Sequence, residues 1–109
     1  MADTLKVLGQ SNPAAATLTT VYTVPASTSA AISGFMVCNR ASTGTTFRIA
    51  VRAGGAAIDN KHYIYFDMPI QANDTLDLVH AIPVETGSII QVYAADANLS
   101  FLVSGIEVT

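Results

Sequence analysis

The sequence contains one cysteine, no tryptophan and few charged residues. Because Cys38 has no second cysteine to pair with, no intrachain disulfide can form, and nothing indicates an oxidising compartment. Five basic residues against eight acidic ones give a net charge of −3, which argues against nucleic-acid binding. No segment approaches the roughly 20 apolar residues of a membrane span, and residues 1–13 lack the pattern of a secretion signal. We therefore expect a protein made in the cytoplasm that binds neither nucleic acid nor membrane.

Apolar residues at helical spacing are also lacking, since no such pattern persists for three turns. Instead, β-branched and aromatic residues fall in short runs, separated by clusters of Gly, Pro, Asn, Asp and Ser. This rhythm predicts an all-β fold, an antiparallel β-sandwich or jelly roll of seven or eight strands. The expected strands span residues 5–9, 17–24, 30–39, 45–52, 61–67, 75–79, 88–94 and 99–109.

The 109 residues suffice for one domain with its own core. We predict a β-sandwich domain over residues 14–109, preceded by an N-terminal arm or first edge strand over residues 1–13. In that segment Lys6, Val7 and Leu8 are apolar enough to add as a strand to the open edge of a neighbouring chain.

The period-2 pattern also predicts which side chains form the core. Strand 30–39 is expected to be buried on both faces, and Gly105 is expected to mark a bulge that resets the phase of the last strand. The predicted core residues are Leu18, Val24, Ile32, Met36, Phe47, Ile49, Val51, Ile64, Phe66, Leu76, Leu78, Ile90, Val92, Phe101 and Val103.

Residues suited to catalysis or metal binding are scarce. His62 and His80 each lack a second ligand at metal-site spacing, so local hydrogen bonds are the expected role of both. Asp74 and Asp77 beside Asn73 lack the spacing of a calcium loop, and Cys38 in an apolar strand is expected to be buried and unreactive. We predict no enzyme activity, no cofactor and no metal.

Arginine and tyrosine mark the stretch from residue 45 to residue 66. Arg48 and Arg52 share one face of a strand whose other face is apolar, and Tyr63 and Tyr65 are expected to share one face of the next strand. Arg and Tyr are enriched at protein interfaces, so these four residues are predicted interface residues, together with Lys6, Val7 and Leu8. A solvated face, aromatic packing under a loop and a sugar-stacking platform are the alternatives.

Six segments carry a resemblance to a known family. They are residues 21–26 (Val-Tyr-Thr-Val-Pro-Ala), 37–40 (Val-Cys-Asn-Arg), 46–52 (Thr-Phe-Arg-Ile-Ala-Val-Arg), 60–64 (Asn-Lys-His-Tyr-Ile), 72–75 (Ala-Asn-Asp-Thr) and 92–94 (Val-Tyr-Ala). In this order the chain resembles the small virion structural proteins of tailed bacteriophages. The resemblance extends from about residue 18 to residue 109, and it rests on strand and turn segments.

The resemblance implies a β protein of the virion. For a free-standing domain of this size it implies a capsid decoration (cement) protein at the capsid surface, with the major capsid protein as partner and a homotrimer as the natural form. The alternative that it leaves open is a tail, neck or fibre-tip component, acting as a connector or binding a host receptor or glycan. A carbohydrate-binding module is the competing interpretation of Tyr63, Tyr65 and the Asp-rich turns.

Overall fold

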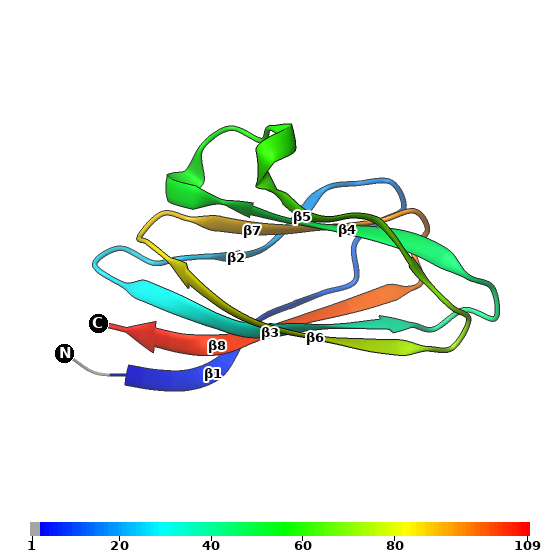
Figure 1. Cartoon of the computed structure of the whole chain (residues 1–109), viewed down its shortest axis with the longest axis horizontal. Coiled ribbons are helices and arrows are strands. Elements are labelled where there is room, and N and C mark those ends of the chain that lie inside the picture. Colours follow the sequence, from blue (N-terminus) through cyan, green and yellow to red (C-terminus); the bar gives the residue numbers. More distant parts are fainter. Residues whose placement is uncertain (1–2) are drawn as a thin grey trace.

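The computed structural model describes residues 3–109, which form two packed layers of antiparallel strands measuring 45 × 27 × 19 Å overall (Figure 1). One sheet has the strand order β1-β8-β3-β6 and the other the order β2-β7-β4-β5. The elements are β1 (Asp3–Ser11), β2 (Thr19–Thr23), β3 (Ser29–Asn39), β4 (Thr45–Arg52), the 3₁₀ turns η1 (Ala53–Gly55) and η2 (Asn60–His62), β5 (Tyr63–Ile70), β6 (Thr75–Val84), β7 (Ile89–Ala94) and β8 (Leu99–Val108).

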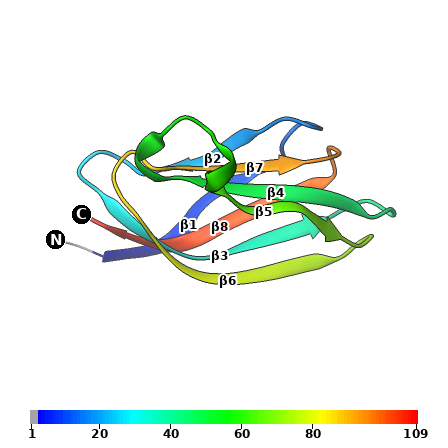
Figure 2. The same ribbon diagram turned by 45° about the horizontal axis from the view of Figure 1, so that its top comes forward.

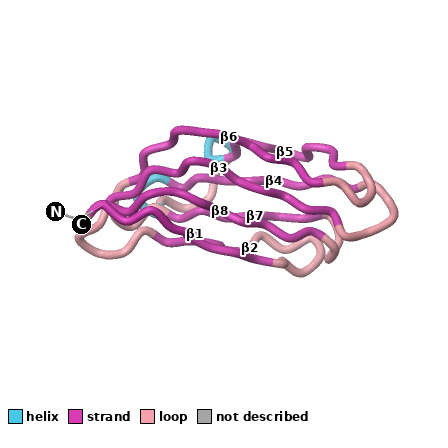
Figure 3. The backbone as a smooth tube through the Cα atoms, turned by 90° about the horizontal axis from the view of Figure 1, so that it is seen from below, coloured by secondary structure: helices cyan, strands magenta, loops and turns pink. Residues whose placement is uncertain are grey.

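The strands run along the long axis, and most connections carry the chain from one sheet to the other (Figure 3). Eight strands in these two orders have the topology of a jelly roll. The predicted all-β sandwich is confirmed. No helix among residues 3–109 has the length and apolar character needed to cross a membrane.

The first strand is an edge strand of this domain. β1 pairs antiparallel with β8 over Asp3 to Ser11, so the segment predicted as an arm or first edge strand lies on its own sheet in the structure. Residues 1 and 2 of the predicted segment lie outside the described part of the chain. Lys6 forms an ion pair of 3.2 Å with Glu107 of β8, and Leu8 packs against the core.

The core lies between the sheets and is built around three phenylalanines. Phe35 and Phe47 are almost completely buried, and the rings of Phe47 and Phe101 meet edge to face at 6.0 Å. Eight of the predicted core residues are buried: Val24, Ile32, Phe47, Ile49, Ile90, Val92, Phe101 and Val103. Val51, Leu76 and Leu78 pack against them while partly exposed, and Leu18 is half-buried.

Three predicted core residues are exposed instead. Met36 is 43%, Ile64 39% and Phe66 56% accessible. In β3 a register shift after Ile32 inserts Ser33 as an extra residue, so Phe35 and Val37 point inward after it and Met36 points out. The prediction that this strand is buried on both faces was therefore wrong for Met36.

The bulge expected at Gly105 lies instead in the two strands that pair with β8. β8 keeps its alternation through Gly105, whereas β1 gains the extra residue Leu8 and β3 the extra residue Ser33 opposite this part of the strand. The expectation of a phase reset in β8 was wrong. A single glycine marks a close backbone approach as readily as a bulge, and sequence alone does not separate the two.

A polar bridge ties the two sheets together near the start of β1. The hydroxyl of buried Tyr22 in β2 donates to a Glu107 carboxylate oxygen of β8 at 2.6 Å, and Lys6 donates to the other oxygen. The hydrogen bond from Tyr22, followed by that from Lys6, lowers the pKa of Glu107 below its ordinary value. Burial, followed by the same hydrogen bond, raises the pKa of Tyr22.

This bridge predicts an acid-dependent loss of stability. Folding lowers the pKa of Glu107, so the ionised carboxylate stabilises the folded protein at pH values above its ordinary pKa of about 4.3. This stabilisation is lost as the pH falls through the lower pKa of the folded state. We expect Tyr22→Phe to reduce the free energy of unfolding by about 1.5 kcal/mol at pH 7. In urea unfolding, the gap between the two proteins should narrow below about pH 4. A gap that stays constant down to pH 2, or an equal loss in Tyr93→Phe on the outer face, would show that the bridge is not responsible.

Candidate functional site

The connection between β4 and β5 arches over the outer face of sheet β2-β7-β4-β5 (Figure 2). Gly54 and Gly55 turn the chain with φ of 64° and 75°, values that favour glycine. The Gly54 N–H donates to Ser88 Oγ at 3.0 Å, and Arg52 Nε donates to the Ala56 carbonyl at 2.7 Å. The first half of the connection is therefore tied to both β4 and the start of β7.

The second half of the connection is closed by a reciprocal pair of hydrogen bonds. The Asp59 side chain accepts from the Asn60 N–H at 2.8 Å, and His62 Nδ1 accepts from the Asp59 N–H at 2.9 Å. This arrangement is a capping box around η2, and it buries His62 to 7% accessibility. His62 therefore has the local hydrogen bond expected from the sequence, and the turn holds Asn60 close to the start of β5.

Arg48 occupies the middle of the same outer face. Its guanidinium carbon lies 4.1 Å from the ring centre of Phe66 and 4.4 Å from that of Tyr93, both cation–π distances. Arg48 Nε also donates to Asp67 Oδ1 at 2.7 Å, and this hydrogen bond is the largest cause of the raised pKa of Arg48. The arginine is thus held by two rings and one carboxylate, and its charge is paired.

Next to this arginine, Tyr63 and Phe66 flank a shallow hollow. Their rings meet edge to face at 5.1 Å, and they line a hollow of about 340 Å³ together with Asn60. We call this the aromatic hollow (Asn60, Tyr63 and Phe66). Phe66 is 56% accessible, an unusually large exposure for a phenylalanine in an ordered strand.

Two irregularities in β5 create this arrangement. Tyr65 pairs with Ile49 and Tyr63 with the adjacent Ala50, so one residue of β5 is extra and the two tyrosines face opposite ways. Asp67 then adopts a left-handed φ of 52° within a second irregularity of the same strand. The prediction that Tyr63 and Tyr65 share one face was wrong.

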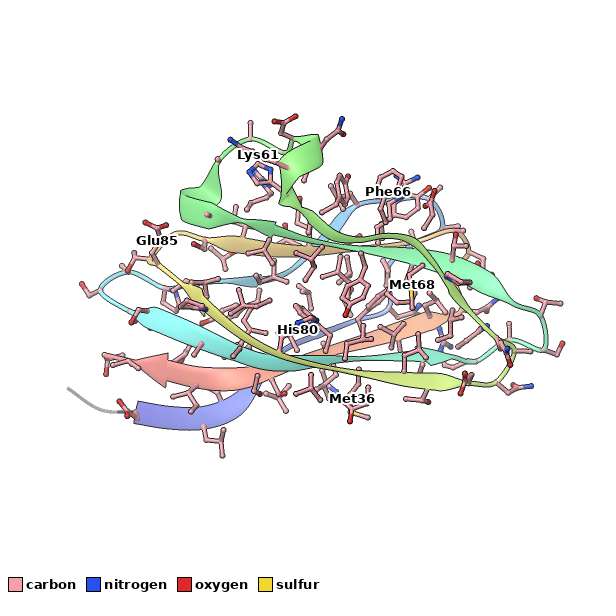
Figure 4. All side chains as sticks on the ribbon, in the orientation of Figure 1. Met36, Lys61, Phe66, Met68, His80 and Glu85 are labelled. Atoms are coloured by element: carbon pink, nitrogen blue, oxygen red, sulfur yellow. The ribbon has the colours of Figure 1, made fainter. Side chains whose placement is uncertain are left out.

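Tyr65 faces the interior. Its ring lies 6.1 Å from that of Phe47, and its hydroxyl is 2.9 Å from Nε2 of His80. Because Tyr65 belongs to β5 and His80 to β6, this bond joins the edge strands of the two sheets. Figure 4 shows His80 between the layers and Phe66 outside them.

The remaining predicted interface residues are spread over the molecule. Arg48, Arg52 and Tyr63 lie on the outer face of sheet β2-β7-β4-β5, where the structure groups Arg48 and Tyr63 with Phe66 and Tyr93. Val7, 50% accessible, lies on the other sheet. The seven residues therefore do not form one surface.

The opposite outer face, on sheet β1-β8-β3-β6, is apolar. Its exposed large side chains come from all four strands, and we call it the apolar sheet face: Leu5 (78% accessible), Val7 (50%), Met36 (43%), Val79 (77%) and Ile106 (36%). Ser33 and Ser104, hydrogen-bonded to each other at 3.2 Å, lie on neighbouring strands of this sheet. Figure 4 shows Met36 projecting away from the sandwich, on the side opposite Phe66.

Charge is sparse on the apolar sheet face. Asp77 shares its outward register with Val79 on β6, and Asp3 shares that of Leu5 at the start of β1. Lys6 of β1 and Glu107 of β8 belong to the same sheet, and they are paired with each other in the bridge to Tyr22. Exposed apolar side chains gathered on one sheet face are typical of a surface that binds another protein.

Within residues 3–109, no group of three or more His, Cys, Asp or Glu side chains lies close enough together to hold a metal ion. Asp67 pairs with Arg48, and Asp74 accepts from the N–H of Thr75 at 2.8 Å. Cys38 was expected to be buried but is only half-buried in the structure.

Sequence reasoning missed Asn60, Phe66, Asp67 and Tyr93 as members of a surface cluster. Phe66 was predicted to be in the core because regular alternation places it on the same strand face as Ile64 and on the opposite face from Tyr65. A signal did exist at Asp67, since aspartate tolerates a left-handed conformation better than most residues and Pro69 follows two positions later. Asp67 and Pro69 together indicate an irregular strand, but they do not show at which residue the irregularity lies.

Comparison of the chain with protein-family models, with curated proteins and with solved structures found no significant match.

Proposed function

We propose that this protein is a structural protein of a tailed bacteriophage virion, and specifically a capsid decoration protein that binds across subunits of the major capsid protein and stabilises the head. The observation that carries the proposal is the apolar sheet face. Burying such a surface contributes roughly 25 cal/mol per Å² of apolar area, and exposed hydrophobic side chains on all four strands offer that area to a partner.

Two further arguments support this role. The first is the resemblance to small phage virion proteins inferred from the six sequence segments, and the second is the strand order of a jelly roll, an architecture used by viral capsid domains among others. The second argument is a fold analogy, which raises the expectation without assigning the task. A homotrimer, the major capsid protein as partner and a place on the capsid surface remain predictions of the resemblance.

A tail, neck or fibre-tip component is the second candidate. It would use the same apolar sheet face to join a neighbouring virion protein, and the aromatic hollow on the opposite sheet would face away from that contact. The position of the protein on the particle distinguishes this role from head decoration.

The test uses heads assembled from the major capsid protein encoded together with this chain. We expect the wild-type protein to bind these heads and to raise their resistance to heat. The double variant Leu5→Lys/Val79→Lys should bind at least about tenfold more weakly, because each lysine replaces an apolar contact with a charge that must be desolvated. Co-sedimentation with the heads measures the binding. Both side chains are more than three-quarters exposed, so the isolated variant should keep its melting temperature.

Ile58→Lys is the matched control. Ile58 is a 41% accessible hydrophobic residue in the β4–β5 connection, away from the apolar sheet face, and its replacement should leave head binding unchanged. Undiminished binding of the double variant would contradict the docking face. A particle reconstruction that locates the protein on the tail or neck would replace head decoration with the second candidate.

A further inference from the structure

The aromatic hollow differs from the apolar sheet face in shape and chemistry. It is a concave site of about 340 Å³, bordered by the rings of Tyr63 and Phe66 and by the polar residue Asn60. It lies on the opposite sheet of the sandwich, so it would stay accessible with the apolar sheet face covered. A volume near the lower end of ligand-site sizes admits one or two small rings.

The structure preorganises the walls of this hollow. Phe66 is held by its edge-to-face contact with Tyr63 at 5.1 Å and by the guanidinium of Arg48 at 4.1 Å. The capping box of Asp59 and His62 fixes the backbone of Asn60, whose side chain is exposed. Because the two rings and this backbone are already held in place, less ordering entropy is lost when a ligand binds.

The charges around the hollow select the class of ligand. Arg48 would ordinarily attract an anion, yet its charge is paired with Asp67 at 2.7 Å. A cationic ligand would need the ring faces of Phe66 and Tyr93, and Arg48 itself already lies over them. The remaining chemistry is an exposed aromatic surface beside an amide, which suits a neutral ligand that has an apolar C–H face and hydroxyl groups at its rim.

We propose that the aromatic hollow binds a neutral saccharide. One pyranose ring packs its C–H groups into the angle between the rings of Phe66 and Tyr63, which meet at 85°, and its hydroxyl groups exchange hydrogen bonds with the Asn60 side chain. The open shape of the hollow suits a terminal sugar or an exposed unit of a longer glycan. This site is independent of head docking, so a failure of either proposal leaves the other in place.

The experiment titrates the isolated full-length protein with glucose, galactose, mannose and N-acetylglucosamine, each up to tens of millimolar, with oligosaccharides of the same sugars, and with sialic acid as the anionic comparison. ¹H–¹⁵N NMR spectra report the binding. We expect at least one of these sugars to shift the amide signals of Asn60, Tyr63 and Phe66. Phe66→Ala should weaken that binding at least tenfold, whereas Phe66→Tyr, which keeps the ring, should retain most of it.

Val79→Lys, on the opposite sheet, is the matched control and should bind the sugar as the wild type does. Three outcomes would overturn the proposal: no signal shifts with any sugar, equal sugar binding by Phe66→Ala and the wild type, or a preference for anionic sialic acid over all the neutral sugars. If Phe66→Ala instead abolishes self-association measured by sedimentation, the aromatic hollow belongs to a subunit contact.

Discussion

Phe47→Ala is expected to lower the free energy of unfolding by about 3–5 kcal/mol. Phe47 is fully buried in β4, and its ring contacts those of Phe101 at 6.0 Å and Tyr65 at 6.1 Å. Phe47 and these two neighbours come from three different strands in two sheets, so no single movement can fill the space that the ring leaves. The loss is therefore the transfer free energy of the ring plus the cost of a cavity. Urea or guanidinium unfolding at neutral pH measures it.

Phe66→Ala is the matched control, because it removes the same side chain from the neighbouring strand of the same sheet. Phe66 is 56% accessible and contacts Arg48 and Tyr63 at the surface, so we expect a loss below about 1.5 kcal/mol. Comparing the two variants tests the structure against the alternation pattern, because the pattern places both phenylalanines in the core and the structure places only Phe47 there. Equal losses in the two variants would contradict the outward position of Phe66.

Gly105→Ala is expected to cost about 3 kcal/mol, although it adds only one methyl group. A Cβ atom at this position would overlap the backbone carbonyl oxygen of Ala31 on β3 and lie 3.1 Å from the Cα atom of Ile32. Gly105 is buried between β1 and β3, so the strands must separate and weaken the ladder on at least one side. Thermal unfolding should show a melting temperature lowered by more than 10 °C, given roughly 4–8 °C per kcal/mol for a domain of this size.

Gly44→Ala provides the comparison. Its Cβ would lie 3.4 Å from the carbonyl oxygen of Ile70, an ordinary contact, and its φ lies outside the left-handed region. We expect a change within about 1 kcal/mol, with a contribution from the reduced entropy of the unfolded chain. A Gly105→Ala protein as stable as Gly44→Ala would show that β3 and β8 separate easily at this point.

The fold class could be predicted from the sequence. Period-2 alternation, turn residues between the runs and the lack of helical spacing are local properties, and they predicted seven or eight strands close to the positions of the eight observed ones. β4 was predicted with its observed bounds, Thr45–Arg52. β6 was predicted to end at Val79, where His80 and Pro83 interrupt the apolar pattern. The strand instead extends to Val84, and His80 faces Tyr65 in the interior.

On irregular strands, the side chains that reach the surface could not be predicted from the sequence, because their orientation depends on the tertiary pairing of the strands. One extra residue inverts the inward and outward faces of all that follow it, and Met36, Tyr65 and Phe66 were misplaced for this reason. The position of such a residue depends on how neighbouring strands pair, which involves segments far apart in the chain. The apolar sheet face is therefore a product of register, since its residues come together only when strands distant in sequence pair in one particular alignment. The residues of the aromatic hollow are close in sequence, and the irregular pairing of β5 with β4 decides which of their side chains face outward.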